Sequence, residues 1–451
     1  MIPAPTLAAV ALGLVSSLAA QEAAPLPVER PNLLLVVADD LGVDRVAAYG
    51  AHPDPPSTPH LDSLAADGVL FENAWSAPVC SPSRAMLLTG RRNFELGVGH
   101  ALPYATYPIE LSTHWTSVAD VLGEQGYARH LVGKWHLSAA AQSGLQHPLA
   151  MGFEHVAQSM AIGPPWYPPA YWAYVKNLNG GSVRALGTYA ATDKVDDVLR
   201  LAAQSSEPWF CWLAFDLPHD PFHAPPAQLH NQRLPAQIVG NEPLFHRAMV
   251  EALDSELGRL LNGLDPAVRA RTVVVFVGDN GTPQAATDAP FLPAHAKGTL
   301  YEGGIHVPLI VQGPGVARGQ RCEALVMLAD LYATLAELGG SEAPAQAPSR
   351  SLRAHLADPS LPSLHAIIDA GSFSPSTASP PYVDLSWAAR NQAGIKLIQR
   401  RMLWMVTSEE LYDLQADPFE QHNLLPLGPG SPPELLQAHA QLRAHLAGFL
   451  N

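Results

Sequence analysis

Continuous apolar runs of strand length alternate along most of the chain with segments in which apolar residues recur at helical spacing. An uninterrupted apolar run is typical of a strand that is buried on both faces, as in a parallel sheet covered by helices. We therefore predict an α/β domain over residues 31–340. The predicted strands are residues 32–38, 128–132, 208–215, 271–278 and 307–312, and the predicted helices are residues 58–67, 112–125, 189–204, 242–264 and 328–338.

The periodicity shortens beyond an Ala- and Pro-rich segment at residues 341–349. Closely spaced strand candidates there predict an antiparallel sheet. We predict a smaller C-terminal subdomain over residues 351–451, in which this sheet is followed by a closing helix. The strand candidates are residues 365–370, 385–391, 394–400, 402–407 and 410–414, and the helix candidate is residues 433–450.

The first residues of the chain read as a targeting segment. Residues 1–20 carry no charged side chain, and their apolar run is too short to span a bilayer. This pattern predicts a secretory signal peptide, although no Lys or Arg precedes the run, and a transmembrane anchor is the alternative. Residues 21–30 are rich in Pro and Ala and predict a linker. A signal peptide implies a secreted or periplasmic protein with no stable membrane anchor.

Charge and cysteine content narrow the possible partners. The chain has 41 acidic and 26 basic residues, for a net charge of −15. This charge argues against nucleic acid as a partner, and an anionic substrate would need a local basic pocket. Three cysteines are too few for a disulfide framework. Cys211 lies in a predicted strand and is expected in the core, Cys322 has no assigned role, and a bridge between the two is left open.

Pairs of oxygen ligands follow two of the predicted strands. Asp39 and Asp40 come directly after residues 32–38, and Asp279 and Asn280 come directly after residues 271–278. Open parallel sheets place their ligands beyond the carboxyl ends of strands. A helix cap would explain either pair alone, but both pairs together suit a hard divalent cation, with Ca²⁺ or Mg²⁺ favoured over zinc.

The stretch Cys80-Ser81-Pro82-Ser83-Arg84 indicates a loop that enters a helix. Pro82 suits the first position of a helix and Ser81 suits the cap before it. A cysteine at a helix entrance is expected to have a lowered pKa and to be reactive. The alternative is that Cys80 is a small core residue under a loop.

This pentapeptide, followed by Leu88-Thr89-Gly90, resembles the signature of the type I sulfatases, and the resemblance extends over nearly the whole mature chain. It implies an alkaline-phosphatase-like core with a mixed, mostly parallel sheet. It also implies that a formylglycine-generating enzyme oxidises Cys80 to formylglycine, whose hydrated aldehyde attacks the sulfur of a sulfate ester. Further, it implies one Ca²⁺ (with Mg²⁺ possible), held by the modified Cys80 and by Asp39, Asp40, Asp279 and Asn280.

Three further elements match the same family. Residues 133–137, Gly-Lys-Trp-His-Leu, match in full and would supply Lys134 and His136 to the sulfate. His219 matches a Pro-His-x-Pro element, and Lys297 matches the family's second sulfate-contacting lysine. The family usually has arginine where this chain has His306, a departure expected to affect a loop and not the chemistry.

The resemblance also assigns roles to the catalytic residues. Arg84 would stabilise the aldehyde hydrate, while Lys134 and Lys297 would neutralise charge on the sulfate oxygens. His219 or Lys297 would protonate the leaving alkoxide, and His136 would act as the base that releases sulfate.

An irregular, Pro-rich stretch at residues 163–174 is crowded with aromatic residues. Such rings stack on sugars or aryl groups, and they also anchor loops onto a core. Trp166, Tyr167 and Trp172 are therefore candidates for binding the substrate beyond its sulfate, as is His223, which could instead hydrogen-bond its own loop.

The sequence is identified as that of an exported, Ca²⁺-dependent sulfatase acting on a sulfated small molecule or glycan. A phosphodiesterase or phosphonate monoester hydrolase of the same superfamily would share the nucleophile and metal, so it remains the alternative. An inactive sulfatase-like binding protein is the further alternative.

Overall fold

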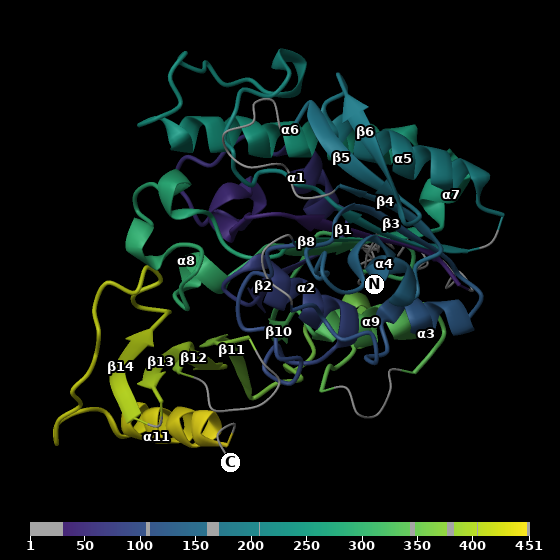
Figure 1. The fold of residues 1–451 in the computed structure, drawn as a ribbon. Coiled ribbons are helices and arrows are strands. Elements are labelled where there is room, and N and C mark those ends of the chain that lie inside the picture. The colour runs from purple at the N-terminus through teal and green to yellow at the C-terminus, as the bar shows by residue number, and fades with distance from the viewer. Residues whose placement is uncertain are drawn as a thin grey trace, which may run out of the picture.

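A computed structural model of the chain describes residues 30–104, 109–159, 171–206, 208–342, 348–376, 383–403 and 405–448. These residues form a large sheet between two layers of helices, with a smaller sheet beside it (Figure 1). The large sheet has ten strands in the order β10 (Gln320–Met327), β2 (Val69–Trp75), β9 (Leu309–Gln312), β8 (Thr272–Gly278), β1 (Asn32–Ala38), β7 (Trp209–Ala214), β3 (Ala128–Lys134), β4 (His155–Ser159), β5 (Ala173–Leu178) and β6 (Gly181–Leu186).

The middle of the large sheet is parallel. β8, β1, β7, β3 and β4 pair in parallel, whereas β9 runs antiparallel to β8 and to β2, and β5 and β6 add an antiparallel edge. Every residue of β1 is buried. Leu33 and Leu35 pack in the core on one face of the sheet, whereas Leu34 and Val36 pack in the core on the other. The α/β core expected from the apolar runs is confirmed, as is the mixed, mostly parallel sheet that the family resemblance implied.

Helices from both halves of the domain cover the two faces. The core on one face includes apolar side chains of α2 (Cys80–Thr89), α3 (Val118–Glu124) and α9 (Asp330–Leu338). The core on the other face includes those of α1 (Pro59–Ala66), α5 (Ala190–Gln204) and α6 (Glu242–Gly263). The shorter helices are α4 (His147–Ala150), α7 (Pro266–Ala270), α8 (Glu302–Ile305) and α10 (Arg353–Ala357).

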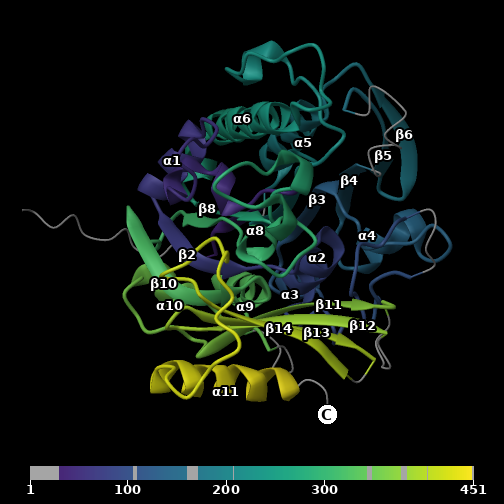
Figure 2. The same cartoon turned by 90° about the vertical axis from the view of Figure 1, so that its left-hand side faces the viewer.

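The C-terminal sheet is packed between a helix and the large domain (Figure 2). It is antiparallel, in the order β11 (Ile367–Ser374), β12 (Asp384–Asn391), β13 (Ile395–Met402) and β14 (Met405–Asp413). Leu442 and Leu446 of α11 (Pro433–Ala447) pack on one of its faces. On the other face, Ile398 packs in a cluster with Trp75 and Ile305 of the large domain. The expected antiparallel sheet and closing helix are present.

Several expected boundaries were wrong. The helix expected at residues 112–125 begins only at Val118, because Ser117 and Asp120 form a capping box in which each side chain accepts the other's backbone N–H. The strand candidates at residues 402–407 and 410–414 are a single strand, β14, which follows a tight turn at Leu403. β2, β4, β5, β6 and β10 were not expected as strands.

The residues expected to form the signal peptide and most of the linker lie outside the described part of the chain. Among the residues that the structure describes, no helix combines the length and the apolar character needed to cross a membrane. Cys211 is buried in β7, as expected, and Cys322 is buried in β10. Four strands separate β7 from β10 in the sheet, so the Cys211–Cys322 bridge is excluded and both thiols are free.

A buried ion cluster joins the two sheets. Lys396 of β13 is 0% exposed, and its Nζ lies 3.0 Å from Glu302 Oε1 and 2.8 Å from Glu420 Oε1. The ammonium also lies over the ring of Trp75, 4.9 Å from its centroid. Since Glu302 begins α8, this cluster connects the C-terminal sheet to a helix of the large domain.

Replacing this lysine is expected to destabilise the whole chain. Lys396→Met removes the cation that Glu302 and Glu420 share and leaves Glu302 with His306 and the more distant Arg390, and breaking a buried pair in this way typically costs about 3–5 kcal/mol. Urea unfolding would measure the change in free energy. Adding Glu302→Gln and Glu420→Gln to Lys396→Met is expected to recover part of the loss. A loss below about 1 kcal/mol, the range of exposed pairs, would contradict the prediction.

Candidate active site

The candidate site lies at the carboxyl ends of the central parallel strands. Asp39 and Asp40 follow β1, Asp279 and Asn280 follow β8, and Lys134 is the last residue of β3. Because these strands are parallel, their carboxyl ends meet at one edge of the sheet. The loop after β7 brings His219 to the same edge, and the first turn of α2 brings Cys80.

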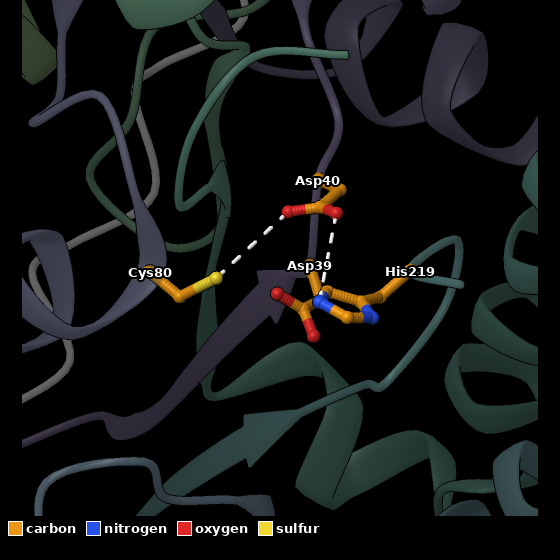
Figure 3. Close-up of side chains that lie close together, drawn as sticks. All are labelled: Asp39, Asp40, Cys80 and His219. Atoms are coloured by element: carbon orange, nitrogen blue, oxygen red, sulfur yellow. Dashed lines mark hydrogen bonds and ion pairs between the residues drawn. The ribbon is translucent and has the colours of Figure 1, made fainter. Parts of the chain in front are cut away.

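Four side chains converge closely there (Figure 3). One donor atom from each of Asp39, Asp40, Cys80 and His219 lies within 4.8 Å of the others. Asp40 is central, with Oδ1 3.8 Å from Cys80 Sγ and Oδ2 3.8 Å from His219 Nε2. Its backbone has a positive φ of 69°, a conformation that non-glycine residues adopt at a cost.

The second oxygen pair is tied to the first. Asp40 N donates to Asp279 Oδ1 at 3.0 Å, and Asn280 Nδ2 donates to Asp40 Oδ1 at 2.8 Å. Asn280 Oδ1 and Asp39 Oδ1 are buried and accept no hydrogen bond from the described residues. Buried oxygens are normally satisfied. These two oxygens, which accept no hydrogen bond from the described residues, lie beside further carboxylates. Together they form a set of oxygen ligands that fits a hard divalent cation.

Three basic side chains surround these acids. Lys134 Nζ lies 2.5 Å from Asp39 Oδ2, Lys297 Nζ lies 2.6 Å from Asp40 Oδ1, and Arg84 Nη2 lies 2.7 Å from Asp279 Oδ2. Burial alone would raise the pKa of Asp39, but Lys134, His219 and Arg84 hold it well below its ordinary value. Burial and the neighbouring Asp39 instead raise the pKa of Asp279 to about 6. This group gathers positive charge locally in a protein whose net charge is negative.

The expectation that Cys80 has a lowered thiol pKa was wrong. Its side chain is only 2% exposed, and burial raises the pKa despite the ammonium groups of Lys134 and Lys297. The cap assignment also differs, because α2 begins at Cys80 with Val79 as its N-cap. Ser81 Oγ is therefore not a cap; it donates to His136 O at 2.8 Å and accepts from Leu102 N at 2.9 Å.

The residues expected to contact sulfate are brought together. Lys134 Nζ lies 3.6 Å from Cys80 Sγ. His136 has a φ of 62° and therefore does not continue β3. Its ring is nevertheless close enough to Lys134, Arg84 and His219 for their positive charge to lower its pKa. Burial and these cations hold the pKa of His136 well below its ordinary value, which keeps the ring neutral. The neutral ring has one unprotonated nitrogen, and the lowered pKa makes it a weaker base than an ordinary histidine.

His219 presents one ring nitrogen to the site. Its side chain is 27% exposed, and Nδ1 lies 2.6 Å from the carbonyl oxygen of Asp220. A carbonyl only accepts, so Nδ1 carries a proton and donates it. Nε2 is the nitrogen that faces Asp40. It can give up a proton only when the ring is an imidazolium.

The candidates for binding the rest of the substrate are placed less clearly. Trp166 and Tyr167 lie outside the described residues. Trp172 packs against the core on the α5 and α6 face, and both ring nitrogens of His223 have partners, Pro221 O and Tyr189 Oη, each at 2.9 Å. Among the described residues of the aromatic stretch, Tyr171 and Tyr174 are buried, as expected of core anchors.

His306 is the C-cap residue of α8. Its Nε2 donates to Glu72 O at 2.8 Å, and its Nδ1 lies 3.2 Å from Glu302 Oε2. The ring therefore links two segments of the chain.

The fold is that of the alkaline-phosphatase-like superfamily, and the comparisons give the family within it. A profile of the sulfatase family matches residues 31–341, and the chain belongs to that family. Human arylsulfatase A is 29% identical over 96% of this chain and 91% of its own. Mouse arylsulfatase J is 28% identical over 70% of this chain, but the match spans only 54% of that relative's length.

Solved structures agree on the fold. The crystal structure of Ps i-CgsB in complex with k-i-k-neocarrahexaose superposes with a TM-score of 0.74 at 23% identity, over 92% of each chain. At this identity the likeness shows the fold alone.

Two residues near the site make contacts that sequence reasoning did not predict. Ser81 was expected to be a cap and Tyr171 a core anchor, yet the hydroxyls of both bind backbone oxygens of the segments that carry His136 and His219. Nothing in the sequence signals this, because the partner of a buried hydroxyl depends on which loop the fold places beside it.

Proposed function

We propose that this protein hydrolyses sulfate monoesters with a nucleophile derived from Cys80. The convergence of Cys80 with four oxygen ligands and two lysines at one sheet edge supports this proposal most directly. Modification of Cys80 to formylglycine by a formylglycine-generating enzyme is part of the proposal. An unmodified thiol with a raised pKa would be a poor nucleophile in this setting.

The residues present would hold the two groups that such chemistry needs. Asp39, Asp40, Asp279 and Asn280 would bind Ca²⁺, which supplies a Lewis acid that polarises a sulfate oxygen. Formylglycine at position 80 supplies a hydrated aldehyde, which has the second hydroxyl needed for eliminating sulfate.

The chain's own cations would bind and orient the substrate. Lys134 and Lys297 each contact an aspartate of the site and lie within reach of a sulfate placed at Cys80. Their charge would stabilise the negative charge that develops on the sulfate oxygens. Arg84 orients the site by binding Asp279 through Nε and Nη2 and Lys134 O through Nη1.

Two histidines would move protons. As the nucleophile at position 80 bonds to sulfur and the bond from sulfur to the ester oxygen breaks, the electron pair of that bond would pass to the ester oxygen, which would take a proton from Nε2 of His219. His136, kept neutral by burial and by nearby cations, would accept the proton that must leave before sulfate is released.

A sulfated carbohydrate is the proposed substrate class. One structural neighbour is described in complex with its substrate D-glucosamine-2-N,6-O-disulfate, and rat N-acetylgalactosamine-6-sulfatase is 31% identical over 74% of this chain. Export through the signal peptide, to the periplasm or outside the cell, would bring the enzyme to such glycans. A phosphodiesterase or phosphonate monoester hydrolase would use the same nucleophile and metal.

Relative turnover separates these two activities. The enzyme is expected to hydrolyse 4-nitrophenyl sulfate faster than a bis(4-nitrophenyl) phosphodiester of the same charge, because the sulfate offers three non-bridging oxygens to the two lysines and the metal, whereas the diester offers only two. Purified holoenzyme would be assayed on both, and then on a panel of sulfated saccharides that differ in sulfate position. Faster turnover of the phosphodiester would assign the alternative function.

A further inference from the structure

The loop that carries His219 is held by a buried tyrosine from another part of the chain. Tyr171 is 1% exposed, and its hydroxyl oxygen lies 2.7 Å from Asp216 O and 2.7 Å from His219 O. Burial and the nearby Asp216 keep the pKa of this hydroxyl well above its ordinary value, so it remains a donor. The Tyr171 hydroxyl thus contacts both Asp216, near the start of the loop, and His219.

The ring of Tyr171 also belongs to an aromatic cage around His223, which lies four residues after His219. The two ring centroids are 4.1 Å apart, and Trp172 and Tyr189 approach the same imidazole at 5.3 and 5.7 Å. His223 Nδ1 donates to Pro221 O, so Nε2 accepts from the Tyr189 hydroxyl. Burial lowers the pKa of His223 to about 4, in agreement with a neutral ring in this cage.

The start of the loop is fixed by charge. The carboxylate of Asp216, which is 4% exposed, accepts from Ser159 Oγ at 3.0 Å and pairs with Lys194, whose side chain is also buried. Asp216 is thereby anchored to β4 and α5. The backbone carbonyl of Asp216 also accepts from the Tyr171 hydroxyl, as the carbonyl of His219 does. The hydroxyl therefore connects His219 to the anchored residue Asp216.

We propose that Tyr171 is a positioning residue for His219. Its hydroxyl fixes the His219 backbone so that Nε2 is aimed at the ester oxygen that leaves. This inference rests on the proposed function, and specifically on proton donation by His219. In this proposal Tyr171, a residue of the aromatic stretch, orients His219. This role differs from stacking on the substrate and from general support of the core.

Tyr171→Phe tests the proposal, because it removes the hydroxyl and keeps the ring of the cage. A misplacement of the order of 1 Å in a catalytic group can cost ~10²-fold in rate. The leaving group of an alkyl sulfate such as glucose 6-sulfate is an unstable alkoxide, which needs a proton from the general acid. The leaving group of 4-nitrophenyl sulfate is a stabilised phenolate, which does not need one. We expect kcat to fall about 10–100-fold on a sugar sulfate that the wild type turns over, and less than about threefold on 4-nitrophenyl sulfate.

Matched variants separate positioning from general support. Tyr174→Phe removes another buried hydroxyl of the same stretch, one that binds Asp193 and not the His219 loop, and should lower kcat on neither substrate. Tyr189→Phe removes the hydrogen bond to His223 in the cage and should lower kcat on the sugar sulfate more than on the aryl sulfate, by less than Tyr171→Phe does. If Tyr171→Phe does not fold, this difference between the two substrates in Tyr189→Phe tests the positioning role instead. Circular dichroism and Tm would confirm folding of each.

His219→Ala distinguishes failure of the inference from failure of the proposed function. If it lowers kcat much more on the sugar sulfate than on the aryl sulfate while Tyr171→Phe lowers both equally, proton donation stands and the positioning role of Tyr171 is overturned. If His219→Ala itself lowers both equally, proton donation by His219 is overturned, and the role of Tyr171 with it.

Discussion

Cys80→Ala is expected to abolish sulfate ester hydrolysis while leaving the protein folded. The substitution removes the thiol whose oxidation would create the aldehyde, so the proposed nucleophile cannot form, and loss of a covalent nucleophile typically costs about 10⁴-fold or more in kcat. The Cys80 sulfur lies against Asp40 and Lys134, so its removal takes little apolar packing away. Turnover of an aryl sulfate, with Tm as the folding check, would measure the effect.

Cys211→Ala is the matched control, since Cys211 is also fully buried but packs in the core on the α5 and α6 face of the sheet. It is expected to lower Tm and to retain activity per folded molecule. Peptide mass spectrometry of wild-type protein, made in a host that converts the motif, should show an aldehyde at position 80, lighter than the thiol. Active enzyme that contains only the thiol would rule out the proposed nucleophile.

Asp39→Asn is expected to remove Ca²⁺ binding and, with it, activity. Calcium affinity depends on the number of charged ligands, and substitution of even an outer-shell partner typically costs ~10–100-fold in metal affinity. Loss of a direct ligand charge should cost more, and it also leaves Lys134 without its carboxylate partner. Isothermal titration with Ca²⁺ would give the affinity independently of activity.

Asp254→Asn is the control for the loss of a buried carboxylate. Asp254 is 1% exposed on α6 and accepts the backbone N–H groups of His60 and Leu61 on α1, at 3.1 and 2.8 Å, and none of these is a site residue. It should bind Ca²⁺ as the wild type does. Wild-type enzyme should lose activity on chelation and regain it with Ca²⁺, so full activity after thorough demetallation would exclude the metal from the reaction.

The sequence alone predicted the elements whose patterns are local and strong. Buried strands such as β1 and β8 are continuous apolar runs, and polar residues directly after them mark the strand ends. Boundaries set by a single cap or turn were predicted less well. The start of α3 depends on the hydrogen bonds between Ser117 and Asp120. The span of β14 depends on its pairing with β13 along its whole length.

The edge strands were missed for a related reason. β5 and β6 are stabilised by pairing with each other and with β4, and several of their residues are exposed, so no continuous apolar run marks them. A strand of this kind is defined by its neighbours more than by its own composition.

What the sequence determined by itself is which chemistry the chain carries: the cysteine signature, the two oxygen pairs at strand ends, and the lysines and histidines of three later elements. Chemical identity and strand periodicity are local properties, and a parallel sheet brings its strand ends to one edge. Only the tertiary structure decided the state and support of these groups. Desolvation of Cys80 raises its thiol pKa, and the hydroxyl of Tyr171 binds the His219 loop, because burial and hydrogen-bond partners depend on segments distant in sequence that only the folded chain brings together.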